Sequence, residues 1–143
     1  MNIKIKKLHP DALVPKYQTL QAAGFDIHSI EDTIVAAQES KLIKTGLSMS
    51  IQNGYELQIR PRSGLALKHS ISVLNSPGTI DSDYRGEIMV ILINHSTQEF
   101  AIKKGDRIAQ GVVSKVYQAD FIEVEELDDT LRGSGGFGSS GIK

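Results

Sequence analysis

The sequence predicts an all-β fold, either a sandwich or a barrel. Three observations support this: short apolar–polar alternations recur along the chain, turn residues separate them at regular spacing, and almost no stretch has helical periodicity. The 143 residues suit one domain with a substantial core, since 40% are hydrophobic and 23% are charged. We assign this domain to residues 1–131, because the composition changes abruptly at Arg132.

Composition argues against several classes of function. The chain has no cysteine, which excludes disulfides, thiolate zinc sites and cysteine nucleophiles, and its four histidines lack ligand spacing. A net charge of −1 argues against a nucleic-acid partner. No apolar run approaches the length of a membrane span and no leader-like segment opens the chain, so we expect a cytoplasmic protein without a membrane partner.

Two short strands are expected early in the chain. Residues 2–8 alternate isoleucine with lysine, which is the period of a half-buried strand. The next strand follows Gly24, a residue suited to a bend or a close backbone approach. It places Phe25 and Ile27 on one face and therefore turns Asp26 to the other. On local sequence, a solvent-facing strand aspartate is the simpler interpretation of Asp26.

A β-hairpin is the strongest local prediction. Apolar residues alternate over 47–51 and again over 55–59, with the pair Asn53-Gly54 between them. Asn-Gly suits a type I′ turn, which joins two neighbouring antiparallel strands. We therefore predict that these two segments pair with each other.

One short helix is expected at residues 65–68, directly after a Pro-Arg-Ser-Gly turn. Ser63 is placed to cap this helix, and free backbone N–H groups at its start, beside Arg62, would form a small anion site. A structural cap next to a surface arginine explains the same residues. The local sequence does not choose between the two.

Residues 73–90 form the segment around which the rest of the chain is organised. A turn over residues 75–78, in which glycine is expected to supply a positive φ, leads into the extended step Thr79-Ile80. A second turn follows at once. Such a short strand, pinned at both ends, holds Asp81 where the strand opens into a loop. On spacing alone, Asp81 and Asp83 are ordinary turn formers.

Further strands are expected at 33–35, 41–45 and 88–93, and residues 112–124 are expected to add one or two more. The run at 88–93 is apolar throughout, as expected of a strand covered on both faces. A turn at 103–106 precedes the last strand. We expect Asp106 at its end to form a structural ion pair with Arg107.

Residues 132–143 cannot build a core alone, because they contain five glycines and a single aliphatic side chain. Their Gly-x-Gly-x-x-Gly pattern lacks the preceding strand and following helix that a dinucleotide site needs. A disordered tail is the simplest interpretation. An arginine and a phenylalanine among glycines, Arg132 and Phe137, also suit a flap that closes over a phosphate and a ring.

Five segments, in this order, resemble the signature motifs of the trimeric dUTP pyrophosphatases (dUTPases). They are residues 23–26 (A-G-F-D), 61–64 (P-R-S-G), 75–87 (N-S-P-G-T-I-D-S-D-Y-R-G-E), 105–110 (G-D-R-I-A-Q) and 132–141 (R-G-S-G-G-F-G-S-S-G). The resemblance implies a jelly-roll-like distorted β-barrel, also called a β-clip, with one very short helix and a flexible glycine-rich tail. It also implies a homotrimer whose active sites each draw motifs from three chains.

The reaction implied by the resemblance is hydrolysis of dUTP to dUMP and diphosphate by water attack on the α-phosphorus. It limits uracil incorporation into DNA and supplies dUMP for thymidylate synthesis. By position, Asp81 would activate water, Tyr84 would lie against the deoxyribose and Asn75 would read uracil. Asp26 would act through water on a Mg²⁺ ion held mainly by the triphosphate. The other residues implied to bind substrate are Arg62, Ser63, Gly64, Gly78, Thr79, Ile80, Met89, Gln110, Arg132, Phe137 and Gly138.

Two alternatives stand beside this hypothesis. A dCTP deaminase, or a bifunctional deaminase and dUTPase, shares the barrel, but the glycine-rich tail with Arg132 and Phe137 favours hydrolysis. A catalytically silent β-barrel interaction module is the alternative from a different class. The presence of Asp81, Tyr84, Arg132 and Phe137 together argues against it.

Overall fold

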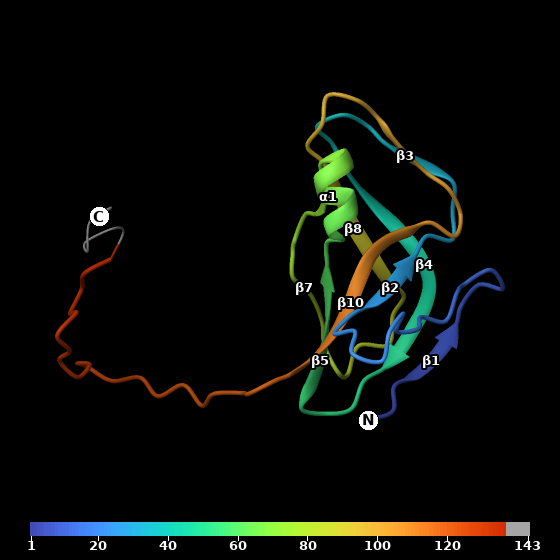
Figure 1. Cartoon of the computed structure of the whole chain (residues 1–143). Helices are drawn as coiled ribbons and strands as arrows, with labels where there is room; N and C mark the ends of the chain where they lie inside the picture. Colours follow the sequence, from blue (N-terminus) through green and yellow to red (C-terminus); the bar gives the residue numbers. More distant parts are fainter. Residues whose placement is uncertain (137–143) are drawn as a thin grey trace.

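The computed structural model describes residues 1–136 and is built almost entirely of β-strands (Figure 1). Its elements, in chain order, are β1 (Lys4–Lys7), β2 (Phe25–His28), β3 (Thr33–Val35), β4 (Ser40–Ser50), β5 (Tyr55–Arg60), α1 (Ser63–His69), β6 (Ile71–Val73), β7 (Gly78–Ile80), β8 (Ile88–Asn94), β9 (Phe100–Ile102) and β10 (Arg107–Lys115). The predicted all-β class with one short helix is therefore confirmed.

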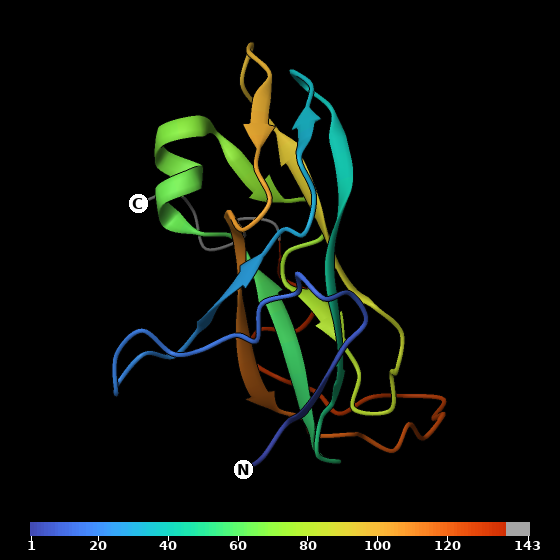
Figure 2. The same cartoon turned by 90° about the vertical axis from the view of Figure 1, so that its right-hand side faces the viewer.

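The strands form two four-stranded sheets and one two-stranded sheet. The strand order is β1-β4-β8-β6 in the first sheet, β2-β10-β5-β7 in the second and β3-β9 in the third. Figure 2 shows the two-stranded sheet at the end of the molecule near α1, away from the N-terminus. Over residues 1–136 the two larger sheets stay open, with edges at β1 and β6 and at β2 and β7, so strand pairing does not close them into the barrel that the resemblance implied.

Apolar side chains from both larger sheets form one core. Its fully buried members include residues of each sheet: Ile43, Leu47, Ile71, Val90 and Leu92 from the first, and Ile27, Leu57, Ile59 and Ile108 from the second. Burial of these side chains is the main force that holds the two sheets together, because apolar area removed from water contributes about 25 cal/mol per Å².

The hairpin predicted around Asn53-Gly54 is wrong. The turn itself forms, since Gly54 has a φ of +83° and the Tyr55 N–H donates to the Gln52 carbonyl over 3.2 Å. However, β4 pairs with β1 and β8, whereas β5 pairs with β10 and β7. The turn therefore carries the chain from one sheet to the other. The apolar residues before and after it face the same core from opposite sheets, which produces the same period-2 alternation as a hairpin.

The strand β8 is covered differently from the prediction. Every second residue, starting with Ile88, is fully buried, but Met89, Ile91 and Ile93 between them are only partly covered. One face of β8 thus packs on the core, and the apolar residues of the other face remain accessible. Met89 and Ile91 line the pocket described below, which accounts for an apolar face that the core does not need.

The last predicted strand is shorter than expected. β10 ends at Lys115, and residues 116–136 contain neither strand nor helix. Figure 1 shows this segment leading away from the sheets. We call residues 116–131 the arm. Its large apolar side chains lie exposed, among them Tyr117, Phe121, Ile122, Leu127 and Leu131. They have no core to join within the described part of this chain.

The helix α1 is seven residues long. Among residues 1–136, no helix has the length and the apolar composition needed to cross a membrane.

Candidate active site

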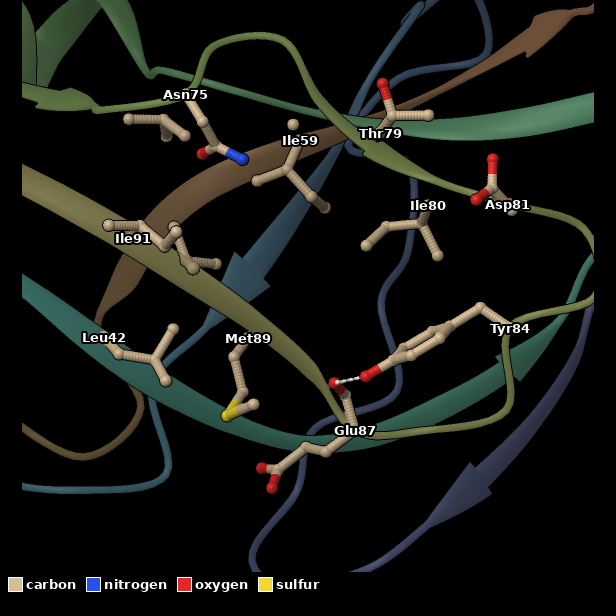
Figure 3. A pocket seen from close by; sticks show the side chains of 13 residues that line it. Leu42, Ile59, Asn75, Thr79, Ile80, Asp81, Tyr84, Glu87, Met89 and Ile91 are labelled. Carbon is tan, nitrogen blue, oxygen red and sulfur yellow. Dashed lines mark hydrogen bonds between the residues drawn. The ribbon is translucent and has the colours of Figure 1, made fainter.

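A pocket of about 230 Å³ lies where β7 of one sheet faces β8 of the other (Figure 3). Seven of the residues predicted to act on substrate line it: Asn75, Gly78, Thr79, Ile80, Asp81, Tyr84 and Met89. The sequence did not single out Leu42 and Glu87, which line it as well. The wall is mostly apolar, with an amide at one end and a carboxylate and a phenol at the other.

Gly78 permits a close approach of the Asn75 side chain and is not needed for its backbone conformation. It lies in β7 without the positive φ that we predicted. A Cβ placed on it would meet the Asn75 Nδ2 atom at 3.3 Å and the Ile59 Cβ at 3.4 Å. Glycine at this position lets the Asn75 amide lie close against β7, facing the pocket (Figure 3).

Asp81 follows the last residue of β7 and is exposed. Its backbone carbonyl accepts a hydrogen bond from the Tyr84 N–H over 3.2 Å, which closes the predicted turn. Within residues 1–136 its carboxylate forms no hydrogen bond or ion pair, and the residue lies at the rim of the pocket. A carboxylate in this situation can accept a proton from a water molecule.

Tyr84 lies on the same turn, with its ring along the pocket wall below Ile80 (Figure 3). The Tyr84 hydroxyl donates to the Glu87 backbone carbonyl over 3.0 Å. The ring is thus tied to the chain three residues later, and it lies between the carboxylate of Asp81 and the thioether of Met89 (Figure 3).

A second cluster is built around Asp26, whose side chain is 12% exposed. Its carboxylate lies 3.1 Å from the Arg62 Nε and 3.5 Å from the Arg107 Nη1. The Arg62 Nη1 also donates to the Arg107 carbonyl over 3.0 Å. We call Asp26, Arg62 and Arg107 the ion cluster. Its location means that the local interpretation of Asp26 as a solvent-facing strand residue was wrong.

The predicted ion pair between Asp106 and Arg107 is also wrong. Arg107 pairs with Asp26 instead, because residue 107 lies opposite His28 in the antiparallel pairing of β10 with β2. The Asp106 carboxylate accepts a hydrogen bond from the Lys103 N–H over 2.8 Å and so closes the turn before β10.

Gln110 lies beside the ion cluster, opposite Asp26 in the pairing of β10 with β2. Its amide nitrogen donates to the Pro61 carbonyl over 2.8 Å, next to Arg62 in the chain. Gly24 provides the room, since a Cβ there would lie 2.7 Å from the Gln110 Oε1. The close approach predicted for Gly24 is therefore confirmed.

Ser63 is not the cap of α1, contrary to the prediction. Arg62 occupies the cap position with extended backbone angles (φ −95°, ψ 128°), and no side chain caps the helix. The first helical donors are the N–H groups of Leu65 and Ala66, both bonded to the Arg62 carbonyl. The Ser63 and Gly64 N–H groups therefore precede the helical ladder, and nothing lies within 4 Å of a Cβ placed on Gly64.

Burial lowers the pKa of His28 at the edge of the ion cluster. The nearby carboxylate of Asp26 opposes this effect, and the positive charges of Arg107 and Arg62 add to it. The His28 Nδ1 atom is buried without a hydrogen-bond partner among the described residues. His28 is thus a neutral side chain that adds no charge to the ion cluster at pH 7.

The pocket lies at the β7 edge of one sheet, whereas Asp26 of the ion cluster lies at the opposite edge of that sheet. Thr79 and Ile80 belong to β7 and Asp26 belongs to β2, with β5 and β10 between them. Strands are spaced about 4.8 Å apart, so these edges are separated by roughly 14 Å. None of Asp26, Arg62 and Gln110 lines the pocket. The described part of one chain therefore does not bring the two sets of predicted residues together.

Residues 132–136, the beginning of the tail, form no hydrogen bond with the pocket residues or with the ion cluster. Arg132 is exposed, and its Nε donates to the Gly135 carbonyl over 2.8 Å. Phe137 and Gly138 lie outside the described residues.

The fold and the two clusters indicate a class of protein: an all-β protein suited to bind a nucleotide. The pocket is suited to a ring with hydrogen-bonding edges, and arginine guanidinium groups suit phosphate oxygens. Within this class, the chain belongs to the dUTPase family, whose sequence model matches residues 11–141.

Individual relatives agree with this assignment. The chain is 67% identical over 141 residues to the deoxyuridine 5′-triphosphate nucleotidohydrolase of Nautilia profundicola, and the match covers 99% of each chain. It is 60% identical over 142 residues to the protein of the same name from Helicobacter pylori (strain Shi470), covering 99% of this chain and 98% of that one. The solved structure of the Staphylococcus bacteriophage 80alpha dUTPase with dUPNHPP superposes with a TM-score of 0.91 at 28% identity, covering 99% of both chains.

Proposed function

We propose that this chain hydrolyses dUTP to dUMP and diphosphate, with water attacking the α-phosphorus. The reaction limits uracil incorporation into DNA and supplies dUMP for thymidylate synthesis. The observation that carries the proposal is the placement of Asp81, whose carboxylate has no partner in the described chain and lies at the rim of a pocket that also holds Asn75 and Tyr84. Membership in the dUTPase family supports hydrolysis over deamination of dCTP.

Different pocket residues contact the base and the sugar of the nucleoside. The Asn75 amide and the adjoining backbone of β7 offer donors and acceptors to the uracil edge, and the Tyr84 ring lies along the deoxyribose. Asp81 accepts a proton as water adds to the α-phosphorus. The bond from this phosphorus to the bridging oxygen then breaks, and the diphosphate leaves. A positioned base of this kind contributes about 10²–10⁴-fold to the rate.

We call Asp26, Arg62, Ser63, Gly64, Arg107 and Gln110 the phosphate end of the site. These residues bind the triphosphate of the substrate. Guanidinium carries five N–H donors, and Arg62 uses its Nε on Asp26 and a bond from Nη1 on the Arg107 carbonyl, which leaves donors for phosphate oxygens. Ser63, Gly64 and Gln110 lie beside it. Arg132, Phe137 and Gly138 complete the site from the tail, which we propose to close over the bound nucleotide as a flap of residues 132–143 on a single domain of residues 1–131.

Magnesium would be held mainly by the triphosphate. The largely buried carboxylate of Asp26 beside Arg62 fits this arrangement, because Mg²⁺ in such sites keeps most of its waters and a nearby carboxylate can accept their hydrogen bonds. Asp26 would accept hydrogen bonds from those waters at the edge of the ion cluster. When bound, the ion neutralises charge on the phosphate oxygens.

A homotrimer with shared sites accounts for two features of the chain. The pocket lies at the β7 edge of one sheet and Asp26 lies on β2 at the opposite edge, and in a trimer a neighbouring chain would supply the residues that complete each site. The arm exposes apolar side chains such as Phe121, which is 96% exposed, and a neighbouring chain would bury them. We propose no nucleic-acid or membrane partner, and we place the enzyme in the cytoplasm.

Product analysis with the purified full-length protein tests the function. The protein is incubated with Mg²⁺ and dUTP, dCTP, UTP or dTTP, and the products are separated by ion-exchange chromatography. We expect dUMP and diphosphate from dUTP, no dUTP from dCTP, and poor turnover of UTP and dTTP. In ¹⁸O-labelled water the label should enter dUMP. Deamination of dCTP, or label in diphosphate alone, would contradict the proposal.

A further inference from the structure

Tyr84 lies directly over Gly86. A Cβ placed on Gly86 would come within 2.5 Å of the Tyr84 Cζ and closer still to its hydroxyl oxygen. Gly86 has no positive φ, so its backbone conformation is open to other residues. The space alone requires glycine: as long as the Tyr84 ring occupies this place, residue 86 cannot carry a side chain.

Glu87 connects the Tyr84 ring to the sheet. Its backbone carbonyl accepts the hydrogen bond from the Tyr84 hydroxyl over 3.0 Å. Its side-chain Oε1 accepts a hydrogen bond from the Gly46 N–H over 2.9 Å. Gly46 lies at the irregularity in the pairing of β4 with β8, where its φ is +66°. Glu87 therefore satisfies a backbone donor at this bulge, and its own carbonyl is held in place as a result.

Two neighbouring contacts make this attachment rigid. The Ser48 hydroxyl donates to the Arg85 carbonyl over 2.7 Å, and the Thr45 hydroxyl donates to the Ile88 carbonyl. Residues 85, 87 and 88 are thus each bonded to β4, whose Thr45 and Leu47 are 1% exposed. The position of the Tyr84 ring is set by a buried strand, although the ring itself is on an exposed turn.

We propose that Gly86 and Glu87 determine the preference for 2′-deoxyribonucleotides, by fixing the Tyr84 ring as a wall beside the sugar. This inference rests on the proposed function, which places the sugar against that ring. A wall that cannot yield excludes an added hydroxyl, whereas a ring that is free to shift accommodates it. Discrimination against an added hydroxyl at an apolar wall is limited to about 100-fold, so loosening the wall is expected to lose roughly 10-fold to 100-fold in selectivity.

A double-mutant cycle tests the role of Gly86. The ratio of kcat/KM for dUTP to that for UTP is measured with Mg²⁺ for the parent, Gly86→Ala, Tyr84→Ala and the double variant. We expect Gly86→Ala to lower the ratio at least about tenfold in the parent and less than about threefold in the Tyr84→Ala background, where the new methyl group meets no ring. Equal losses in the two backgrounds would show that Gly86 acts through the backbone, which overturns the proposal.

The side chain of Glu87 is tested by a matched pair of variants. Glu87→Gln keeps an oxygen that accepts the Gly46 N–H, and Glu87→Ala does not. We expect Glu87→Ala to lower the dUTP to UTP ratio about tenfold and Glu87→Gln to recover it to within about threefold of the parent. Equal ratios for the two variants would overturn the role of Glu87. If Gly86→Ala fails to fold by circular dichroism, this pair decides the proposal alone.

The outcomes separate this inference from the function on which it rests. If the parent protein does not turn over dUTP, both the proposed function and this inference are wrong. A parent that hydrolyses dUTP selectively, with Gly86→Ala and Glu87→Ala retaining the parental ratio, removes only the inference and leaves the proposed function standing.

Discussion

The proposed nucleoside end and the proposed phosphate end of the candidate site are constructed differently. The nucleoside pocket takes most of its residues from the consecutive segment 75–89, and the Tyr84 ring in its wall is held by a neutral hydrogen bond to backbone. The ion cluster joins Asp26 of β2, Arg62 before α1 and Arg107 of β10, and it is held by opposite charges.

This difference separates the roles of the two ends. Groups held by backbone hydrogen bonds and close glycine contacts have one position, so the nucleoside end is suited to selectivity and to the placement of a base. The side chains of Asp26 and Arg62 are largely buried, at 12% and 25% exposure, and Arg62 keeps N–H donors that are not used on Asp26 or on the Arg107 carbonyl. The proposed phosphate end is therefore suited to bind phosphate oxygens with these donors, and its changes should affect binding of the triphosphate more than the chemical step.

The largest effect is expected for Asp81→Asn, which tests the nucleoside end. The change removes the base but keeps the shape, so kcat should fall by about 10²–10⁴-fold while the affinity for dUTP stays within about tenfold. Single-turnover kinetics and equilibrium binding measure the two quantities. Asp83→Asn, an exposed carboxylate of the same turn, is the matched control and should keep its rate. A rate for Asp81→Asn within about threefold of the parent would reject the assignment of the base.

The next largest effect is expected when the chain is cut before Arg132. Turnover should fall by about 100-fold, because the proposed flap would supply an arginine and a water-poor site. The melting temperature and the oligomeric state should hardly change, since the described residues beyond 131 add nothing to the core. Calorimetry, sedimentation and steady-state kinetics check these expectations, and Phe137→Ala should lose less activity than the truncation. If the truncated protein turns over dUTP at the full rate, the proposal that residues 132–143 act as a flap is wrong.

A smaller effect is expected for Asp26→Asn at the phosphate end. Loss of the negative charge weakens the pairing that orients Arg62 and weakens the hydrogen bonds that residue 26 would accept from the waters of Mg²⁺, so KM for dUTP should rise about tenfold with a smaller change in kcat. Binding of deoxyuridine, which lacks phosphates, should be unchanged. Asp11→Asn is the matched control, because Asp11 also pairs with a cation, Lys104, but contacts neither end of the site. Equal effects of Asp26→Asn on both ligands would contradict the separation of the two ends.

The smallest effect is expected for the exposed pair of Asp11 and Lys104. The hydrogen bond and the positive charge of Lys104 lower the pKa of Asp11 below its usual value of 3.8. A carboxyl group whose pKa is lowered in the folded state stabilises the fold above pH 3.8, and the contribution is lost as the pH falls through the lower folded value. Lys104→Met should thus lower the melting temperature slightly at pH 6 and not at pH 2. Turnover should stay at the parental rate, and a larger loss than that of Asp26→Asn would overturn the ranking.

Several features of the protein followed from the sequence by itself. Alternation predicted the all-β class, and the two turns around Thr79-Ile80 predicted β7 with Asp81 at its end. These predictions held because they depend on neighbours within a few residues, where turn chemistry and strand period act directly. Most of the pocket wall comes from one short segment, but the roles of its residues were implied only by the family resemblance and stay predictions.

The tertiary structure alone decided which strands are neighbours and which charges meet. Period-2 alternation shows that a face is buried but not what covers it, so the Asn53-Gly54 turn resembled a hairpin although it joins two sheets. Asp26 and Arg107 are 81 residues apart, and only the register of β2 with β10 brings them together. The need for glycine at residue 86 depends likewise on a ring that folds back over it. Each of these contacts is set by packing between segments, for which a local pattern carries no information.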